Sequence, residues 1–255
     1  MPGLLDGKVV VVTGGASGIG RGTSLRCAEE GAAVVLGDVR PDPREGGHPT
    51  HELIIATGGT ARYVTCDVRK RDDLEALMEA AEELGGVDVL VNNAGIFRHQ
   101  DFLEADEAAF DTMFDVNVKG VYFAAQAAAR RMVARRSGVI INLSSIAGIR
   151  GASGFVTYCA SKGAVRFMSM ALAAELGPSG VRVCSVHPGV IETSMTTADV
   201  PLLGAATEGA LTRTIGLGRA GTPHDVAGGI VLLASDLAGY VTGASLLVDG
   251  GMMFT

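Results

Sequence analysis

Short apolar runs, rich in β-branched residues, alternate with longer helix-compatible stretches along the whole chain. The runs lie at residues 8–13, 33–38, 62–66, 87–91, 139–143, 181–186 and 245–248. Several of them are apolar throughout, a pattern that is typical of strands covered by helices on both faces. The pattern therefore predicts about seven buried strands.

Helix-compatible stretches fill the intervals between these runs. We predict helices at residues 19–30, 72–84, 106–136, 156–176 and 223–235, and a further helix that begins near Thr50. Gly31 and Gly85 follow the first two as stop signals, and Pro223 suits the first turn of the last. Strand–helix alternation predicts a doubly wound parallel α/β sheet. No linker or repeat divides residues 1–255, so we expect a single domain.

Two segments depart from this regular alternation. Residues 41–49 (PDPREGGHP) interrupt the second crossover and delay its helix. Residues 192–218 are rich in Thr and Gly, show weak periodicity and follow a predicted strand. Long irregular insertions after strand ends are often binding loops, so we expect a substrate loop at about residues 190–218. A loop that is merely tolerated fits the same residues equally well.

Composition and charge narrow the classes of protein. Hydrophobic residues make up 47% and charged residues 19% of the chain, which excludes a disordered low-complexity protein. The net charge of −7 argues against nucleic acid or an anionic membrane as a partner. Four scattered cysteines and five scattered histidines lack metal-ligand spacing, so we expect no metal site and no disulfides. The first residues do not form a signal peptide, and a cytoplasmic location is expected.

A glycine-rich segment, TGGASGIG at residues 13–20, joins the first predicted strand to the first predicted helix. Glycine permits the tight turn, and it leaves N–H groups at the helix N-terminus open to a pyrophosphate. The spacing of Gly14, Gly18 and Gly20 differs from the common GxGxxG, and no P-loop lysine follows. The strand–loop–helix context favours a dinucleotide site over an ordinary turn.

The second predicted strand ends at Asp38, 24 residues after Gly14. In dinucleotide folds an acidic side chain about 20 residues past the loop meets the adenosine ribose. A carboxylate accepts hydrogen bonds from two ribose hydroxyls and repels a 2′-phosphate, so Asp38 favours NAD over NADP. Arg40 keeps NADP open as the alternative, because a guanidinium would bind that phosphate.

Several segments together resemble the short-chain dehydrogenase/reductases over the whole chain. The segments are TGGASGIG at 13–20, Asp67-Val68, NNAG at 92–95, VNVKG around Asn117, INLSSIAG around Ser145, YCASK from Tyr158 to Lys162, Pro188-Gly189 with Thr193, and VDGG at 248–251. The resemblance implies a Rossmann-like fold, a nicotinamide cofactor and a homotetramer. It implies cofactor contacts from Gly14, Ser17, Gly18, Ile19, Gly20, Asp38, Asp67, Val68, Asn93, Ala94, Gly95, Tyr158, Lys162, Pro188, Gly189 and Thr193.

The resemblance also implies a catalytic group of Asn117, Ser145, Tyr158 and Lys162. Tyr158 and Lys162 are four residues apart on a predicted helix, so they share a face. A free phenol has a pKa near 10, and an adjacent ammonium lowers it toward the range of a general acid and base. Ser145 follows the fifth strand and can bind a substrate oxygen, although Ser144 could take that place. By resemblance, Lys162 also holds ribose hydroxyls, and Asn117 orders a water beside it.

The expected substrate pocket is mainly apolar. We expect it to be lined by Ile96, Phe97, residues 146–148 and the loop at 190–218, without a cluster of Arg or Lys. This lining predicts a neutral secondary alcohol or ketone. The alternative within the family is an NADPH-dependent 3-oxoacyl-carrier-protein reductase, which Ser17 and Asp38 disfavour because basic residues are expected there. A sugar-nucleotide epimerase of the extended branch would need a longer chain and another glycine spacing. The non-enzymatic alternative is an NAD-sensing scaffold, and the intact Ser145, Tyr158 and Lys162 argue against it.

Overall fold

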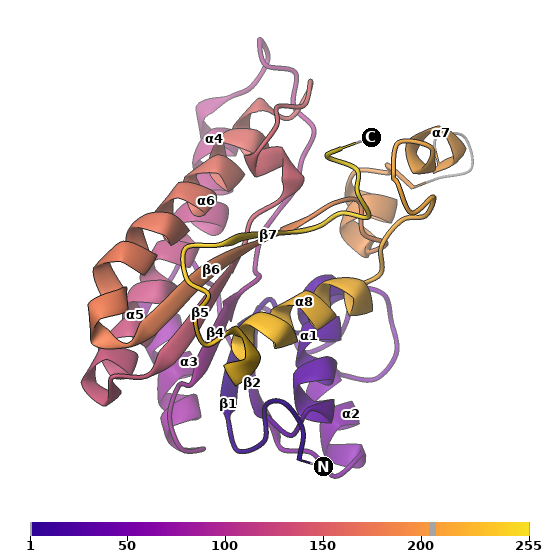
Figure 1. Ribbon diagram of the computed structural model, residues 1–255. Coiled ribbons are helices and arrows are strands. Elements are labelled where there is room, and N and C mark those ends of the chain that lie inside the picture. The colour runs from indigo at the N-terminus through magenta and orange to yellow at the C-terminus, as the bar shows by residue number, and fades with distance from the viewer. Residues whose placement is uncertain (1, 204–207, 255) are drawn as a thin grey trace.

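The centre of the molecule is a parallel sheet of seven strands. Figure 1 shows this sheet in the computed structural model. The structure describes residues 2–203 and 208–254. The strands are β1 (Val9–Thr13), β2 (Ala33–Asp38), β3 (Ala61–Thr65), β4 (Val89–Asn92), β5 (Gly138–Leu143), β6 (Val181–Pro188) and β7 (Ser245–Val248). Their order is β3-β2-β1-β4-β5-β6-β7, and every neighbouring pair is parallel. The predicted Rossmann-like doubly wound sheet is therefore confirmed.

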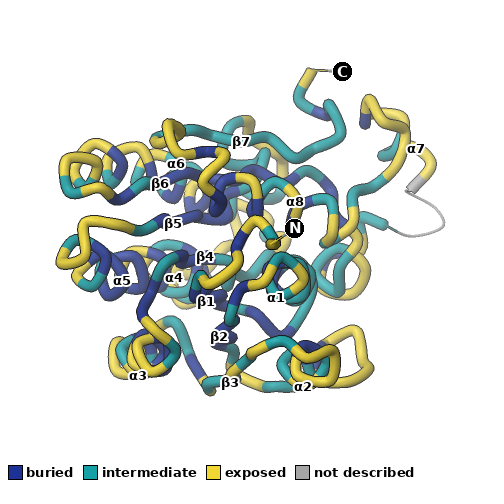
Figure 2. Tube along the Cα trace, turned by 60° about the horizontal axis from the view of Figure 1, so that its bottom comes forward, coloured by how far each residue is buried: buried dark blue, intermediate teal, exposed yellow. Residues whose placement is uncertain are grey.

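Helices cover both faces of this sheet. The α-helices are α1 (Gly18–Glu29), α2 (Thr50–Ala56), α3 (Arg71–Glu82), α4 (Glu107–Phe114), α5 (Val121–Arg135), α6 (Val156–Leu176), α7 (Glu208–Thr212) and α8 (Pro223–Ala234). Figure 2 shows α1, α2 and α8 on one side of the strands, and α3, α5 and α6 on the other. Within the described ranges, no helix has the length and apolar character needed to cross a bilayer.

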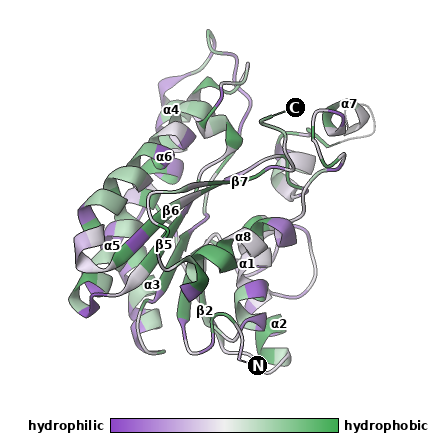
Figure 3. Cartoon of the chain, viewed as in Figure 1, coloured by the Kyte–Doolittle hydropathy of each residue, from purple (hydrophilic) through white to green (hydrophobic). Residues whose placement is uncertain are grey.

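Alternate residues of each central strand enter different cores. Val10 and Val12 of β1 pack in the core beneath α1 and α8, whereas Val9 and Val11 pack in the core beneath α3 and α5. Both faces of the strand are thus shielded from water, which explains why its sequence is apolar throughout. Figure 3 shows the same contrast, with hydrophobic strands inside and hydrophilic residues on the outer helix surfaces. Full burial of each such side chain contributes about 1.5–3 kcal/mol.

The predicted helix at residues 106–136 is not one regular helix. A π-helical turn, η1 (Asp115–Gly120), separates α4 from α5. Asn117 lies in this turn with no exposed surface, and its Oδ1 accepts a hydrogen bond from the Ile96 N–H at 2.8 Å. Its Nδ2 donates to the Ile96 carbonyl at 2.9 Å. The wide turn aims this amide at the segment after β4, which agrees with the frequent occurrence of π turns at functional sites.

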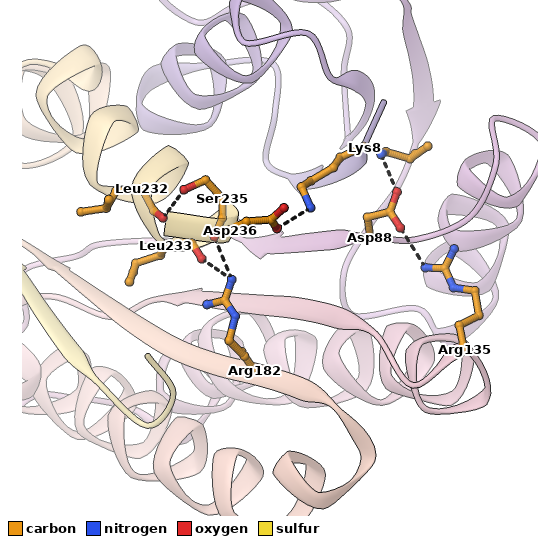
Figure 4. Close-up of polar contacts among 9 residues, drawn as sticks. Lys8, Asp88, Arg135, Arg182, Leu232, Leu233, Ser235 and Asp236 are labelled. Atoms are coloured by element: carbon orange, nitrogen blue, oxygen red, sulfur yellow. Dashed lines mark hydrogen bonds and ion pairs between the residues drawn. The ribbon is translucent and has the colours of Figure 1, made fainter. Parts of the chain in front are cut away.

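Charged residues gather at the amino ends of the strands, as Figure 4 shows. Asp88 accepts a hydrogen bond from the Val9 N–H at 2.8 Å and pairs with Arg135 at 3.3 Å. Lys8 pairs with Asp236 at 3.0 Å. Arg182 donates to the carbonyls at the end of α8, including that of Leu233 at 2.8 Å. These contacts join the starts of β1, β4 and β6 to neighbouring helices, so this edge has a structural role.

A chain of buried side-chain hydrogen bonds crosses the sheet near the opposite edge. Asn92 Nδ2 donates to Asn142 Oδ1 at 2.9 Å, and Asn142 Nδ2 donates to Ser169 Oγ at 2.9 Å. Ser169 in turn donates to the Val165 carbonyl at 2.7 Å. All three side chains are at most 1% exposed. They connect β4, β5 and α6, the elements that precede or carry the predicted catalytic residues.

We expect Asn142→Ala to destabilise the protein by about 1–3 kcal/mol, because Asn92 and Ser169 would each lose a buried partner. For a protein of this size, the melting temperature should fall by about 2–4 °C for each kcal/mol. Thermal unfolding of Asn142→Ala, Asn92→Ala and the double variant measures the coupling between the two amides. Strict additivity of the three changes would contradict a direct interaction.

Candidate functional site

A cleft of about 950 Å³ opens at the carboxyl ends of the strands. The strand order reverses between β1 and β4, and ligands of doubly wound sheets bind at such a reversal. The predicted residues that line the cleft are Gly14, Ser17, Gly18, Ile19, Asp38, Asp67, Val68, Asn93, Ala94, Gly95, Ser145, Tyr158, Lys162, Pro188, Gly189 and Thr193. Gly20 and Asn117 are the predicted site residues that do not line it, since both lie buried behind the wall.

The glycine loop is shaped by close backbone approaches. Gly14 has a φ of +64°, and its N–H donates to the Gly37 carbonyl at 2.7 Å. A Cβ on Gly20 would lie 1.9 Å from the Gly14 carbonyl oxygen, so α1 could not begin so close to the loop with any other residue there. Asn93 Nδ2 donates to the Gly14 carbonyl at 2.9 Å and ties the loop to the end of β4. The N-terminus of α1 consequently faces the cleft.

Asp38 is held at the end of β2 by backbone donors. Its carboxylate accepts hydrogen bonds from Ala16 N–H at 3.1 Å and from Val39 N–H at 2.8 Å. Burial raises the pKa of Asp38 above its ordinary value, and those N–H groups and the nearby Arg40 oppose the rise. The side chain is half-buried at the cleft wall, so part of the carboxylate faces the cleft.

Residues 41–49, which we call the strap, cross the glycine loop without forming a helix. The Arg44 N–H donates to Ser17 Oγ at 2.8 Å, and Glu45 Oε1 accepts a hydrogen bond from the Gly18 N–H at 2.9 Å. The Arg44 guanidinium makes two hydrogen bonds to the Asp199 carboxylate, at 2.6 and 2.5 Å. Asp199 belongs to the π turn η4 (Met195–Asp199) of the expected substrate loop. The strap therefore connects the glycine loop to the substrate side of the cleft.

These residues fit an anionic dinucleotide. The Glu45 carboxylate bound to Gly18 demonstrates that the start of α1 offers a hydrogen-bond donor to an oxyanion. Asp38 stands one strand away with unused acceptor capacity, at the position where ribose hydroxyls are expected. Thr193 lies against Gly18, because a Cβ placed on this glycine would be 3.5 Å from the Thr193 Cβ. Thr193 extends the same wall of the cleft toward β6. The donor set suits a pyrophosphate flanked by sugars.

Ser145, Tyr158 and Lys162 meet on the other half of the cleft. Ser145 follows β5, whereas Tyr158 and Lys162 share one face of α6. The Ser145 side chain lies close enough to the phenol of Tyr158 to lower its pKa. Lys162 is only 5% exposed, and its Nζ donates to the Leu143 carbonyl at 2.8 Å. The same Nζ lies 5.8 Å from the centre of the Tyr158 ring.

The expected lowering of the Tyr158 pKa is wrong for this structure, although Lys162 does lie beside the phenol ring. Burial raises the pKa of Tyr158 to about 12, and the hydrogen bond to Ser145 opposes the rise only in part. Burial also lowers the pKa of Lys162 to about 8. Removal of water disfavours both charged forms, and this effect exceeds the attraction that an ammonium would exert on a phenolate. Spacing along a helix indicates which groups meet, but it contains no information on how dry their surroundings are.

The two neighbouring serines have different partners. Ser144 Oγ donates to the Lys162 carbonyl at 2.8 Å and is 4% exposed. Ser145 Oγ accepts a hydrogen bond from the Ala147 N–H at 3.1 Å and lies near the phenol of Tyr158, whose pKa it lowers. The Ser144 hydroxyl is thus used within the protein, and Ser145 is the better candidate for contact with a substrate.

Asn117 reaches the cleft only through other residues. Besides its bonds to Ile96, its Nδ2 lies 3.2 Å from Ser161 Oγ, which donates to the Tyr158 carbonyl at 2.8 Å. A Cβ on Gly95 would lie 3.3 Å from Asn117 Oδ1 and 3.5 Å from Lys162 Nζ. The glycine thus lies between these two polar groups, and both pack closely against it. Asn117 holds the NNAG segment beside α6. Its water-ordering role stays a prediction.

The substrate side of the cleft is partly as expected. Ile96, Phe97, Ile146 and Ala147 line it, although Gly148 does not. No cluster of Arg or Lys is expected in this lining, and the structure adds two arginines to it, Arg98 and Arg150, both exposed. Their side chains come from irregular segments, where no periodicity predicts direction. Residues 204–207 of the expected loop at 190–218 lie outside the described residues.

Phe97 is an expected lining residue, whereas Phe155 and Glu45 of the lining, and Asp199, which pairs with Arg44, were not expected. The Phe97 ring packs against the Tyr158 ring with centroids 4.6 Å apart, and it stacks on Phe155 at 4.8 Å. Phe155 stands three residues before Tyr158, so helical spacing could have indicated it. Glu45 and Asp199 could not be found in this way, since their contacts join distant loops.

Comparisons with known proteins agree with this architecture. A family model described as enoyl-(acyl carrier protein) reductase, adh_short_C2, matches residues 14–253. L-rhamnose 1-dehydrogenase (NAD(P)(+)) of Azotobacter vinelandii is 44% identical over 252 residues, 98% of each chain. The 3-oxoacyl-[acyl-carrier-protein] reductase FabG of Thermotoga maritima is 41% identical, over 98% of this chain and 99% of its own.

A solved structure leads to the same family. The short-chain type dehydrogenase/reductase from Mycobacterium marinum superimposes with a TM-score of 0.90 and 36% identity, covering 98% of this chain and 97% of that chain. The reaction class is therefore oxidation of alcohols or reduction of ketones with a nicotinamide dinucleotide, NAD or NADP. The chain belongs to the short-chain dehydrogenase/reductase family.

Proposed function

We propose that this enzyme transfers a hydride between NAD(H) and a neutral secondary alcohol or ketone, with Tyr158 as the general acid and base. The observation that carries the proposal is one cleft whose lining contains Asp38 together with Ser145, Tyr158 and Lys162. When bound, the nicotinamide supplies or accepts the hydride. Every proton movement then depends on this chain's own side chains.

Ser145 and Tyr158 would act together on the substrate oxygen. The Ser145 hydroxyl donates a hydrogen bond to that oxygen as negative charge develops on it. In ketone reduction Tyr158 gives its phenolic proton to the oxygen, and in alcohol oxidation the phenolate takes the proton back. A pKa of about 12 keeps Tyr158 protonated in the free enzyme, which suits the reductive direction. The Phe97 ring, packed against Tyr158, holds the phenol in place.

Lys162 would assist the oxidative direction while it is charged. Its ammonium favours the phenolate form of Tyr158, and its pKa of about 8 means that the charge is present at neutral pH. Above that pH the lysine loses its proton, and its attraction for the phenolate disappears. Lys162 also lies where ribose hydroxyls of the cofactor would be bound, between Gly95 and Tyr158.

The preference for NAD rests on the charges around the adenosine end. Asp38 would accept hydrogen bonds from both ribose hydroxyls and would repel a 2′-phosphate. Arg44, a cation on the same part of the lining, is already paired with Asp199. Arg40 is the remaining guanidinium beside Asp38, and it acts on the Asp38 carboxylate by charge. The balance at this end favours free hydroxyls over a phosphate.

The neutral substrate is supported by the apolar side chains on the cleft lining. Ile96, Phe97, Ile146, Met195 and Leu202 contribute to that lining. A second candidate is favoured by one observation, since Arg98 and Arg150 are exposed on the same lining. Guanidinium groups suit phosphate, so a 3-oxoacyl group on a phosphate-containing carrier, reduced with NADPH, is the alternative. The 41% identity to the Thermotoga maritima reductase supports the same alternative.

Initial rates of nicotinamide reduction test the proposal directly. We expect turnover of neutral cyclic or linear secondary alcohols with NAD⁺ and little with NADP⁺. Tyr158→Phe keeps the aromatic ring but loses the proton, so its rate should fall by about 10²–10⁴-fold. Unchanged turnover in this variant would favour a scaffold that senses NAD, and a strong preference for NADP(H) and carrier-bound ketones would favour the second candidate.

Exchange of the acidic group at the ribose end should change cofactor choice. We expect Asp38→Asn to shift the NAD/NADP ratio of kcat/KM by about 10- to 100-fold toward NADP, because hydrogen bonds to a charged group are lost and repulsion is removed. Arg40→Ala is the matched variant, and it should shift the ratio toward NAD or leave it unchanged. A shift toward NAD in Asp38→Asn, together with a shift toward NADP in Arg40→Ala, would contradict the role given to Asp38.

Glu45 should compete with the dinucleotide for the Gly18 N–H. Removal of its charge in Glu45→Gln is expected to lower the dissociation constant for NAD⁺ by about two- to fivefold, the usual size of a charge effect at a helix N-terminus. Equilibrium titration measures this without turnover. Glu52→Gln, an exposed change on α2, is the control. Weaker NAD⁺ binding by Glu45→Gln would mean that the strap supports the bound cofactor instead.

A further inference from the structure

We propose that His187 is the positioning residue for Ser145, because its buried imidazole fixes the backbone of Ser145 against β6. The proposal rests on the proposed function, in which the Ser145 hydroxyl contacts the substrate oxygen. His187 occupies the next-to-last position of β6, directly before Pro188 and Gly189 of the cleft wall. It therefore lies between the expected cofactor wall and the serine.

Both ring nitrogens of His187 have partners, and the ring has no exposed surface. Nδ1 lies 2.9 Å from the Ser145 carbonyl oxygen, and Nε2 lies 2.9 Å from Ser185 Oγ. A carbonyl oxygen can only accept, so the ring proton belongs on Nδ1. Nε2 then accepts the hydroxyl proton of Ser185, whose Oγ lies 3.3 Å from Ser245 Oγ. The surroundings select a single tautomer.

The bond from His187 lies just beyond the last backbone hydrogen bond between β5 and β6. The ladder between β5 and β6 ends where the Ser144 N–H donates to the Val186 carbonyl at 2.8 Å. Pro188, the next residue of β6 that could donate toward β5, has no N–H. The Gly148 N–H also reaches the Ser145 carbonyl, at 2.9 Å, but it comes from the same loop as Ser145. His187 thus supplies the contact that joins Ser145 to the neighbouring strand.

The charge state of His187 agrees with a positioning role. Burial lowers the pKa of the imidazole, the hydrogen bond to the Ser145 carbonyl opposes this in part, and the positive charges of Arg166 and Lys162 lower the pKa further. The ring is consequently neutral at neutral pH and is already used at both nitrogens. Because its two nitrogens are bonded to Ser185 and to the Ser145 carbonyl, the ring does not serve as a proton carrier. Its effect on the reaction passes through the position of Ser145.

A small displacement of Ser145 should matter for the rate. The Ser145 hydroxyl must stay within hydrogen-bond distance of both Tyr158 and a substrate oxygen. Misplacement of a reacting group by about 1 Å can cost about 100-fold in rate. Loss of the bond between His187 and Ser145 should therefore lower kcat more than it changes substrate or cofactor binding.

Two polar substitutions separate the two contacts of the imidazole. In His187→Asn the amide nitrogen stands at the same number of bonds from the backbone as Nδ1, so it can still donate to Ser145. In His187→Gln the amide is one carbon farther out, at the level of Nε2, and it reaches toward Ser185. We expect kcat within about threefold of wild type for the Asn variant and at least about tenfold lower for the Gln variant. KM and the dissociation constant for NAD⁺ should stay within about twofold in both.

Ser185→Ala and Ser145→Ala complete the experiment. Ser185→Ala removes the partner of Nε2 and leaves the bond to Ser145, so its kcat should resemble that of His187→Asn. Equal losses in the Asn and Gln variants, or losses confined to melting temperature, would overturn the positioning role. If Ser145→Ala itself keeps full kcat, the role of Ser145 in the proposed function fails. That outcome is distinct from a failure of His187 to position the serine, which the His187 variants test.

Nuclear magnetic resonance of the ¹⁵N-labelled imidazole gives a readout without turnover. We expect the His187 proton on Nδ1, with slow exchange because the ring is buried. A proton on Nε2, or a rapidly exchanging one, would overturn the proposal even if the variants do not fold.

Discussion

Burial of both faces of the parallel sheet is the constraint on which the rest of the structure depends. Residues such as Val10 and Val11 face opposite cores, so the central strands offer no exposed face on which polar groups could gather. Chemistry is therefore confined to the strand ends. The amino ends carry paired charges such as Lys8 and Asp236, whereas the carboxyl ends carry the cleft. The reversal of strand order at β1 and β4 then opens space for a ligand at that edge.

The same constraint explains what the sequence could predict. Uninterrupted apolar runs and glycine stops are local signals, and the seven strands and the start of α2 agree with them. Residues that directly follow strands, such as Asp38, Asn93 and Ser145, must meet at one edge because the strands are parallel. The ends of the strands therefore indicate part of the candidate site, whereas Asn117, Tyr158 and Lys162, which lie in helical segments, were indicated by the family resemblance.

Features that depend on tertiary contacts could not be derived in this way. The π turn at Asn117 leaves the Ala-rich pattern unbroken, since its cause is the amide's bonds to Ile96. The strap is irregular, and its contacts through Glu45 and Arg44 join segments far apart in the sequence. Arg98 extends from a segment without periodicity, so its place on the lining has no signal in the sequence.

Desolvation links these elements to the chemistry. The same dry surroundings that raise the pKa of Tyr158 and lower that of Lys162 also hold His187 neutral. In such surroundings a hydrogen bond between uncharged groups keeps its geometry over a wide pH range, whereas an ion pair would have to offset the loss of hydration. A neutral imidazole is therefore well suited to hold Ser145. Tyr158 and Lys162, by contrast, line the cleft. A substrate oxygen bound there can shift the balance between their charged and neutral forms.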